Sequence, residues 1–447
     1  MAERGREERF WHWPGRSLAL EGLEAPPQGH LEPQPQLSID WEGSQNLYCE
    51  GDNLEILKLL APHFRERIQL IYIDPPYNTG HAFVYNDRSG GGHSAWMGFI
   101  YPRLALGWQL LAPGGSLAIS IDDRELPYLR LMAEELWGEE SLVACFPRLT
   151  KKAGKSSAAI ARNHDYLLLY AKKPATFYLP PHSDPGFKYR DEYFSERGYY
   201  KLNQPLDYNS LQYSPSLDYP LEVEGETLYP GASYAKYLER QAGNYARADW
   251  AWRWSKELFN FAYAQGFVVL KRYANRVRLY TKTYQKVKLE KVGGQWQVVP
   301  YERTKRLSTL EFLANPYSND QAKKDLARLM EPALFDYAKP LALMERLCQL
   351  TTGPQDWVLD FFAGSAATAQ AVWELNARQG ARRHFIMVQL PEACAPNSRA
   401  YQVGLADICA IGRQRLRLAR ERLQRENPQP GDYGFQVWRW AEGPAPA

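Results

Sequence analysis

An acidic residue, two prolines and an aromatic residue stand together where a buried strand is expected to end. The apolar run at residues 70–73 leads directly into Asp-Pro-Pro-Tyr-Asn-Thr-Gly at residues 74–80. The fixed backbone φ of Pro75 and Pro76 prevents a helix from starting and keeps the chain extended. Because open α/β sheets bind ligands beyond the carboxyl ends of their strands, we expect this heptapeptide to face a ligand.

The heptapeptide suits chemistry on an exocyclic amino group. The carboxylate of Asp74 and the carbonyl of Pro75 can each accept one proton of an –NH2 group, and the ring of Tyr77 offers a face to a planar base. Such pairing favours the change of an attacking nitrogen from planar toward tetrahedral, which is help given mainly in the transition state. The alternative is a strand-ending turn with a chance aromatic, since Asp-Pro alone is common in turns.

A second loop is predicted to turn from a strand at 357–360 into a helix at 369–375. Gly364 and the small residues after it let the backbone approach a ligand closely, and the helix start presents free N–H groups to a carboxylate or phosphate. The second glycine of a Gly-X-Gly loop is missing and no Gly-Lys-Ser/Thr follows, which argues against a nucleoside triphosphate.

An acidic residue follows the next predicted strand. The apolar run at residues 384–390 ends at Pro391 and Glu392. An acid after the second strand of such a unit commonly binds ribose hydroxyls. A solvated loop acid or a helix N-terminal charge explains Glu392 equally well.

Together the two loops resemble the beta class of S-adenosylmethionine-dependent DNA amino-methyltransferases, in which Asp-Pro-Pro-Tyr precedes a Phe-X-Gly cofactor loop. From about residue 46 to residue 422 the chain also resembles the modification subunit of type III restriction-modification systems. The matching stretches are residues 51–55, 74–80 with Phe83, Tyr85, Asn86 and Asp87, 101–104, 111–125, 163–166 with 170–172, 335–340, 360–369 and 404–408.

The resemblance implies a role for each residue of the two loops. The implied catalytic residues are Asp74, Pro75, Pro76 and Tyr77. The residues implied to bind S-adenosyl-L-methionine are Asp52, Lys339, Pro340, Asp360, Phe362, Gly364, Ser365 and Glu392. For Asp52 a helix cap, and for Lys339 and Pro340 an ordinary helix start, are equally good explanations.

Two departures from the family pattern stand out. Ala366 occupies a position where the family often has a second glycine. The type III subunits continue into a sizeable C-terminal domain, whereas this chain stops soon after residues 432–437, which resemble the beginning of that domain. Docking to a restriction partner is therefore in doubt.

Composition sets limits that agree with this interpretation. The chain has 447 residues, of which 45% are hydrophobic, and a formal net charge of +3, so affinity for nucleic acid has to come from local patches. The five cysteines are scattered without a Cys-X-X-Cys pair, so neither a disulfide framework nor a metal site is predicted. No apolar run is long enough for a membrane span or a signal peptide, which predicts a cytoplasmic protein.

The pattern along the chain predicts an α/β protein with a Rossmann-like, mainly parallel methyltransferase sheet in circularly permuted motif order, plus an inserted α+β target-recognition domain. The predicted parts are an N-terminal arm at 1–40, a catalytic half at 41–173, the inserted domain at 174–330, a cofactor-binding half at 331–425 and a C-terminal tail at 426–447.

The inserted domain carries a basic segment interleaved with tyrosines. We expect DNA contacts from Lys271, Arg272, Arg276, Arg278 and Lys282. Basic residues neutralise phosphates, while aromatics stack on bases or fill the gap left by a flipped base. A hairpin with one wet face would show the same pattern. For Trp250, Trp252 and Trp254 we prefer core packing.

The sequence thus predicts a site-specific methyltransferase that flips an adenine out of duplex DNA and methylates its N6 amino group, without a metal. Adenine is favoured because Asp leads the motif, whereas Ser more usually leads in cytosine enzymes. The alternatives are cytosine N4 methylation, methylation of RNA or of a protein glutamine, and an inactive DNA-binding relic. Besides duplex DNA, the sequence leaves open two partners, a second copy of the chain in a homodimer and a restriction (helicase-nuclease) subunit. Binding to a membrane is not expected.

Overall fold

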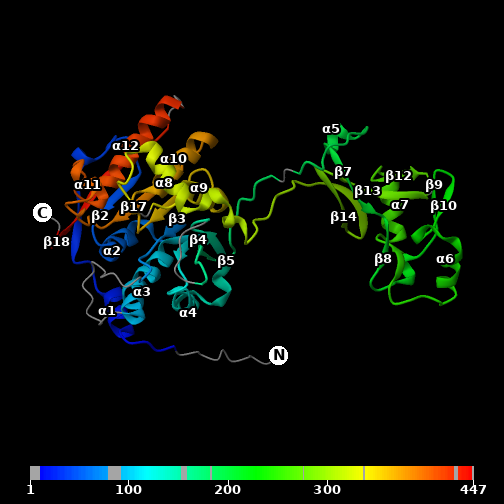
Figure 1. The fold of residues 1–447 in the computed structure, drawn as a ribbon, viewed down its shortest axis with the longest axis horizontal. Coiled ribbons are helices and arrows are strands. Elements are labelled where there is room, and N and C mark those ends of the chain that lie inside the picture. Colours follow the sequence, from blue (N-terminus) through cyan, green and yellow to red (C-terminus); the bar gives the residue numbers. More distant parts are fainter. Residues whose placement is uncertain are drawn as a thin grey trace. The chain divides into compact units, whose positions relative to one another are not determined.

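The computed structural model describes residues 11–78, 92–152, 159–181, 184–274, 276–335, 338–426 and 431–444. The chain forms two compact units (Figure 1). Unit 1 comprises Met1–Leu179 and Leu307–Ala447, and unit 2 comprises Pro180–Arg306. Residues 79–80 of the heptapeptide, and the matching residues Phe83, Tyr85, Asn86 and Asp87, lie outside the described residues.

Unit 1 is built on one mixed sheet. In spatial order its strands are β1 (Gly29–Pro33), β18 (Gln436–Glu442), β2 (Leu47–Glu50), β17 (His384–Gln389), β16 (Trp357–Asp360), β3 (Ile68–Ile73), β4 (Leu111–Ile121), β6 (His164–Ala171) and β5 (Leu142–Leu149). Neighbours pair in parallel from β18 to β4, while β1 and β6 are antiparallel to their neighbours. The predicted mainly parallel α/β sheet is confirmed; the permuted motif order stays a prediction.

The central strands are apolar on both faces, as strands of a parallel sheet covered on both sides are. Leu70 and Tyr72 of β3 belong to one core cluster, whereas Ile71 and Ile73 belong to the other. The helices of the first cluster are α9 (Leu341–Thr351), α10 (Ala367–Gln379) and α12 (Ile408–Glu426). Those of the second are α1 (Arg16–Glu24), α2 (Asn53–Phe64), α3 (His93–Leu110) and α4 (Leu126–Trp137). Beside α12, α8 (Asn319–Leu329) and α11 (Arg399–Gln402) share a small cluster.

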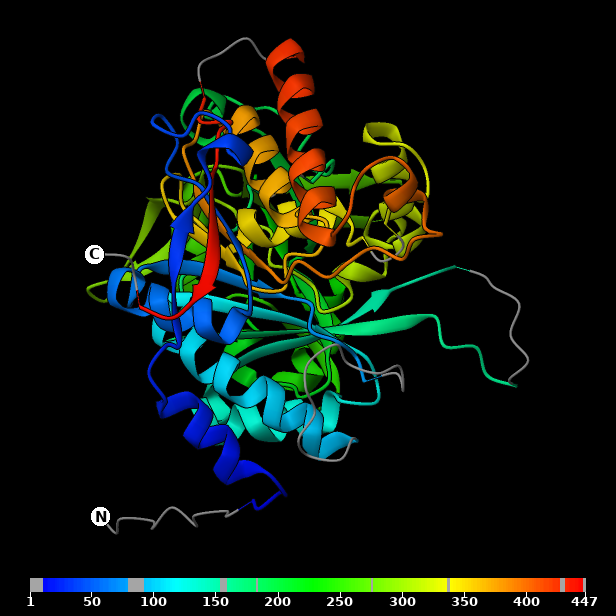
Figure 2. The ribbon, with the colours of Figure 1, turned by 90° about the vertical axis from the view of Figure 1, so that its left-hand side faces the viewer.

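Both ends of the described chain are part of unit 1, which differs from the predicted arm and tail. Within residues 1–40, Trp13 and Ala19 are buried in the second cluster, and β1 pairs with β18 (Figure 2). Within residues 426–447, β18 also pairs in parallel with β2. Prolines suggested an irregular arm, but edge strands tolerate proline and β1 lies at the edge of the sheet.

Unit 2 has a core of its own. Its main sheet consists of β7 (Tyr200–Pro205), β13 (Arg276–Tyr284) and β12 (Val268–Tyr273). Leu206, Phe259 of α7 (Lys256–Ala264) and Leu279 are among its buried residues. The smaller elements are α5 (Phe194–Arg197), β8 (Asp207–Ser210), β9 (Leu221–Val223), β10 (Glu226–Leu228), α6 (Tyr234–Gln241), β11 (Asp249–Trp252), β14 (Val287–Val292) and β15 (Gln295–Pro300).

Unit 2 is shorter than the predicted insert at 174–330. Residues 307–330 belong to unit 1 because their apolar side chains enter its core. Phe312 is fully buried and packs edge-on against Phe146 of β5 at 5.1 Å between ring centroids. Leu326 of α8 and Met330 pack in the cluster beside α12.

The described part of the chain has neither a membrane-spanning helix nor a cluster of metal ligands. No helix there is long and apolar enough to cross a membrane. No group of three or more His, Cys, Asp or Glu side chains there is arranged to hold a metal ion.

The two ends of unit 2 meet, so we predict that it can be removed without unfolding unit 1. The Lys305 amide donates to the Pro180 carbonyl at 2.9 Å, and Pro181 bridges to Thr304. Replacing residues 181–304 by two glycines should leave a cooperative thermal transition, shifted by no more than about 5 °C, on the order of 1–2 kcal/mol. Circular dichroism is the measurement. A broad, non-cooperative transition would contradict the division into independent units.

Candidate active site

The two predicted loops meet because their strands are neighbours. β3 pairs in parallel with β16, with Tyr72 opposite Asp360, and β16 pairs in parallel with β17, with Asp360 opposite Met387. The carboxyl ends of the three strands therefore lie at one edge of the sheet. Burial is the main cause of the raised pKa of Asp360, and the nearby carboxylate of Asp74 raises that pKa further, so the two carboxylates lie within electrostatic reach of each other.

The carboxylate of Asp74 is paired with an ammonium group. Lys339 Nζ lies 2.9 Å from Asp74 Oδ1 and also donates to the Tyr77 hydroxyl at 2.9 Å. The same nitrogen is 5.0 Å from the centroid of the Tyr77 ring. Lys339, predicted from its position near the cofactor, is thus brought to the catalytic motif itself.

Tyr77 is held by a buried ion pair behind it. Its hydroxyl donates to Asp165 at 3.5 Å, and Asp165 pairs with Arg148 through two hydrogen bonds. Arg148 is fully buried. Burial raises the pKa of Tyr77 well above its ordinary value, so this hydroxyl stays protonated.

A buried carboxylate fixes the far end of the motif. Glu125, which is fully buried, accepts from Asn78 at 2.6 Å and contacts His93 Nδ1 at 2.8 Å. The indole of Trp96 donates to the Pro76 carbonyl at 2.6 Å. Helix α3 and the start of α4 thereby hold residues 76 and 78 in place.

Asp360 is buried at the end of β16. It accepts hydrogen bonds from the Phe362 amide at 3.1 Å and the Thr368 hydroxyl at 2.6 Å. Burial, the largest influence, raises its pKa from 3.8 to about 7 despite those two hydrogen bonds.

The loop after β16 contains two residues in the left-handed conformation. Gly364 has φ +51° and donates its amide to Gln389 Oε1 at 2.7 Å. Ala366 has φ +61°, so alanine adopts here the conformation for which glycine is favoured. The loop keeps its turn without the family's second glycine, at a cost of about 1–2 kcal/mol.

Asp52 serves as the helix cap that the sequence allowed. Its carboxylate accepts from the Leu54 and Glu55 amides at the start of α2. It also pairs with Arg103, whose Nη2 is 3.0 Å from Oδ2. Next to it, the Asn53 amide group donates to the Phe361 carbonyl at 2.7 Å, which ties α2 to the loop after β16.

The remaining predicted cofactor residues border the same edge. Pro340 is the N-cap of α9, so its backbone role is the ordinary helix start. Glu392 follows β17 and is half-buried, and burial raises its pKa above the usual range. Phe362 faces Phe99 at 6.0 Å between ring centroids. Ser365 is buried and receives a hydrogen bond from Arg415 at 2.9 Å.

Several residues of the site were not predicted as site residues. Arg103 and Glu125 lie in stretches that match the family pattern but were assigned no role, and Arg148 lies in none of those stretches. Their burial shows only in the structure, because the ion-pair partner of each lies 17 or more residues away in the chain. Arg415 was not predicted as a site residue either.

The predicted DNA-binding residues of unit 2 differ in the face of the sheet on which they lie and in whether they form ion pairs. The register of β12 with β13 places Lys271 and Arg276 on one face with Arg278 and Lys282, opposite to the face of Arg272. Carboxylates already pair with Arg272 (Glu224 and Glu226), Arg278 (Asp207) and Lys282 (Asp191). Lys271 and Arg276 form no ion pair with any described residue.

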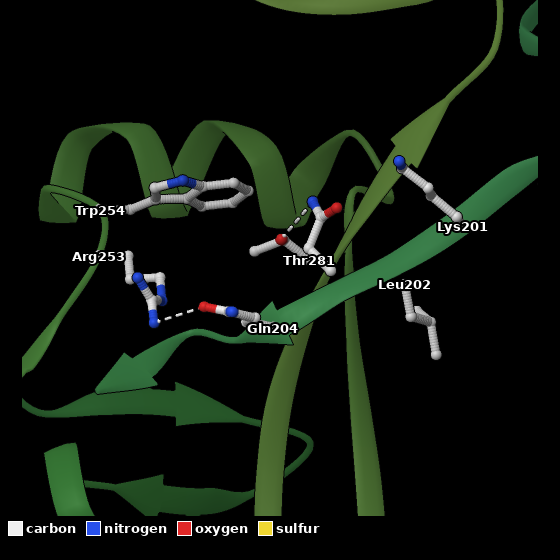
Figure 3. A pocket seen from close by; sticks show the side chains of 7 residues that line it. Lys201, Leu202, Gln204, Arg253, Trp254 and Thr281 are labelled. Atoms are coloured by element: carbon white, nitrogen blue, oxygen red, sulfur yellow. Dashed lines mark hydrogen bonds between the residues drawn. The ribbon is translucent and has the colours of Figure 1, made fainter. Parts of the chain in front are cut away.

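Unit 2 also carries an open hollow of about 560 Å³ (Figure 3). It is lined by Lys201, Leu202, Asn203, Gln204, Arg253, Trp254 and Thr281. Arg253 and Gln204 point toward each other, and Arg253 Nη2 donates to Gln204 Oε1 at 2.9 Å. None of the seven residues is acidic. Trp252 is buried in the core as expected, and Trp254 packs against that core and also borders the hollow.

The geometry of unit 1 agrees with a family match. Residues 68–398, well over half of the chain, match the DNA methylase family that methylates N6 or N4 amino groups. The chain belongs to this family. It is accordingly an S-adenosylmethionine-dependent DNA methyltransferase. The predicted family membership and cofactor are confirmed.

Relatives resemble this methylase over most of its length. It is 28% identical to the type III restriction-modification enzyme EcoPI Mod subunit of Escherichia phage P1, over 97% of this chain and 72% of the relative. It is 29% identical to the StyLTI Mod subunit of Salmonella typhimurium LT2, over 90% and 61% of the two chains. It is also 29% identical to the type II methyltransferase M.KpnI of Klebsiella pneumoniae, over 83% and 87%. The methylase thus spans 61–72% of the two Mod subunits.

Likeness to solved structures is weak. The M1.HpyAVI-SAM complex matches 83% of this chain and 98% of its own at 13% identity, with a TM-score of 0.38. The cytosine-N4-specific PvuII DNA methyltransferase matches 85% and 96% at 14% identity, with a TM-score of 0.33.

The raised pKa of Asp360 predicts a pH-dependent stability. The unfolded carboxyl releases its proton near pH 3.8 and the folded one near pH 7. Folding therefore takes up a proton between these values, and the stability that the wild type gains at low pH is lost as pH rises, by on the order of 1.4 kcal/mol per pH unit. Asp360→Asn should remove this loss. Urea unfolding at pH 5, 6, 7 and 8 should show the variant gaining on the wild type as pH rises, whereas a constant difference would contradict the assignment.

Proposed function

We propose that this methylase transfers a methyl group to the N6 amino group of adenine in duplex DNA after flipping the base out of the helix. The observation that carries the proposal is the convergence of Asp74 and Tyr77 with the loop at 360–366 at one edge of the sheet. A base amino group and a donor methyl group have to meet in such a place, because catalysis of this transfer depends mainly on positioning.

The ion pair of Lys339 supports the roles of Asp74 and Tyr77. Its ammonium lies where a target amino group would lie: Nζ is 2.9 Å from Asp74 Oδ1 in an ion pair and 5.0 Å from the centroid of the Tyr77 ring. A base stacked on Tyr77 would present its –NH2 group to Asp74 in the same relation. To bind Asp74, the incoming amino group has to replace Lys339 as the partner of this carboxylate.

The loop after β16 fits the proposed binding of S-adenosylmethionine, which supplies a sulfonium methyl group with a good leaving group. A Cβ added to Gly364 would lie 3.5 Å from the Phe335 ring, so glycine leaves a narrow space between loop and ring. Ser365 provides a hydroxyl and Glu392 a half-buried carboxylate that suits ribose hydroxyls. Phe362 provides an apolar wall. Asp52 contributes to the proposed cofactor site by capping the start of α2 and by pairing with Arg103.

Adenine is proposed over cytosine on the sequence of the motif, since Asp leads it at residue 74. Cytosine N4 methylation is the alternative, and the family description covers both. Hydrolysis of DNA methylated with tritiated S-adenosylmethionine, followed by separation of the nucleosides, distinguishes them. Label in N4-methyldeoxycytidine would overturn the adenine assignment. Label in RNA or protein instead of DNA would overturn the substrate.

We propose further that unit 2 reads the DNA sequence. Lys271 and Arg276 have no carboxylate partner in the part of the chain that the structure describes, so they are suited to phosphates. The hollow offers Arg253 and Gln204, and these side-chain types recognise guanine and adenine edges in the major groove. Arg272, Arg278 and Lys282 would have to exchange their carboxylates for phosphates to contribute.

Partners beyond DNA rest on weaker support. A restriction subunit is proposed because relatives of this chain are Mod subunits of type III restriction-modification enzymes. A homodimer rests on the family resemblance alone.

Replacing the motif acid should abolish transfer while leaving the fold intact. Asp74→Ala removes the acceptor of the target amino group, and we expect methyl transfer to fall by about 100-fold or more. The thermal midpoint and the affinity for S-adenosylhomocysteine should change little. Asp320→Ala, an exposed acid in the first turn of α8, is the matched control. Transfer by Asp74→Ala at the wild-type rate would refute the role of Asp74.

Variants in unit 2 should separate phosphate contacts from sequence reading. In Lys271→Ala/Arg276→Ala we expect binding to weaken on all sequences and the slope of log K against log salt to fall by about 2. Arg253→Ala should instead relax the preference at one position, by about 1–3 kcal/mol. Methylation-sensitive sequencing of a randomised duplex library measures the latter. Lys236→Ala, on α6 and paired with Glu239, is the control. An unchanged preference in Arg253→Ala would exclude the hollow as a reading site.

A further inference from the structure

A buried arginine lies directly behind the loop after β16. Arg415 is on α12 and is only 2% exposed. Its Nη1 donates to Ser365 Oγ at 2.9 Å and contacts the Ser365 carbonyl at 3.4 Å, while its Nε donates to Gln370 Oε1 at 2.7 Å. Two of its three contacts thus fix a single residue of the proposed cofactor loop.

This guanidinium has no carboxylate partner among the described residues. Glu374 and Asp325 act on it only at longer range, and Glu374 is itself engaged by Arg422 and Gln370. Burial lowers the pKa of Arg415 to about 10, so it still carries its charge at neutral pH. An uncompensated buried charge is costly to the fold, which suggests a purpose beyond packing.

The contact with Ser365 also fixes what that hydroxyl can do. Arg415 supplies a proton to Ser365 Oγ, so the proton of the hydroxyl itself remains to be donated to another acceptor. Positive charge and a directed hydroxyl therefore stand together at the turn formed by Gly364 and Ser365. An anionic group is the ligand that this combination favours.

We propose that Arg415 is the positioning residue for the carboxylate of the methyl donor, acting through Ser365. The inference rests on the proposed function, and it adds a residue outside the loop that holds the serine of the loop in place. The guanidinium holds Ser365 Oγ in place as a donor, and its buried charge favours a carboxylate there.

Two ligands that differ in this carboxylate test the proposal by calorimetry. S-Adenosylhomocysteine carries it, whereas 5′-methylthioadenosine lacks the amino-acid part. In Arg415→Met we expect affinity for S-adenosylhomocysteine to fall on the order of ten- to a hundredfold and affinity for 5′-methylthioadenosine to stay within about twofold. Arg417→Met, whose arginine bonds the Leu37 carbonyl from the same helix, should leave both affinities unchanged.

The outcomes separate this inference from the proposed function. If both ligands weaken equally in folded Arg415→Met, or if neither does, Arg415 is only structural and the inference fails. If the wild type binds neither ligand, the proposed function fails first.

Conservative and paired variants keep the test decisive if Arg415→Met does not fold. Arg415→Lys retains the charge and should keep most of the preference for S-adenosylhomocysteine. Ser365→Ala should reduce that preference, and adding Arg415→Lys to it should have less effect than Arg415→Lys has alone. Full additivity of the two changes would overturn the action through Ser365.

Discussion

The parallel pairing of β3 with β16 is the constraint on which the site depends. These strands are separated by more than 280 residues in the chain, yet Tyr72 lies opposite Asp360. Alternate side chains of both strands enter the two cores. A slip of one residue in the pairing would therefore move every side chain of the slipped strand from one core to the other. Hydrophobic register therefore fixes the distance between Asp74 and the cofactor loop, and polar contacts such as that of Lys339 adjust it.

The sequence predicted those parts of the fold whose signal is local. The apolar run at 70–73 lies in β3 and the run at 357–360 forms β16, since fully buried strands read as continuous apolar segments. The convergence of the two loops was also predictable, because parallel strands present their carboxyl ends at one edge. The sequence did not predict the strands at the edge of the sheet. There the proline-bearing β1 pairs with β18, which comes late in the chain, and β18 pairs with β2.

The supporting residues of the site were not predictable for a different physical reason. A buried polar residue is recognised by its partner, and the partners of Glu125, Arg148 and Arg415 come from distant segments. No role was predicted for the arginines of α12, yet Arg413 pairs with buried Glu50 and Arg415 supports Ser365. In unit 2 the same limitation hid the carboxylates that neutralise Arg278 and Lys282.

The hydrogen bond between Lys305 and Pro180 has an evolutionary consequence. A module whose two ends leave the scaffold side by side can be exchanged by recombination at two nearby crossover points, while the packing of the scaffold is untouched. Lineages could then acquire new target sequences in one genetic event, whereas the chemistry of methyl transfer, spread over both halves of the scaffold, would change only slowly and by single substitutions.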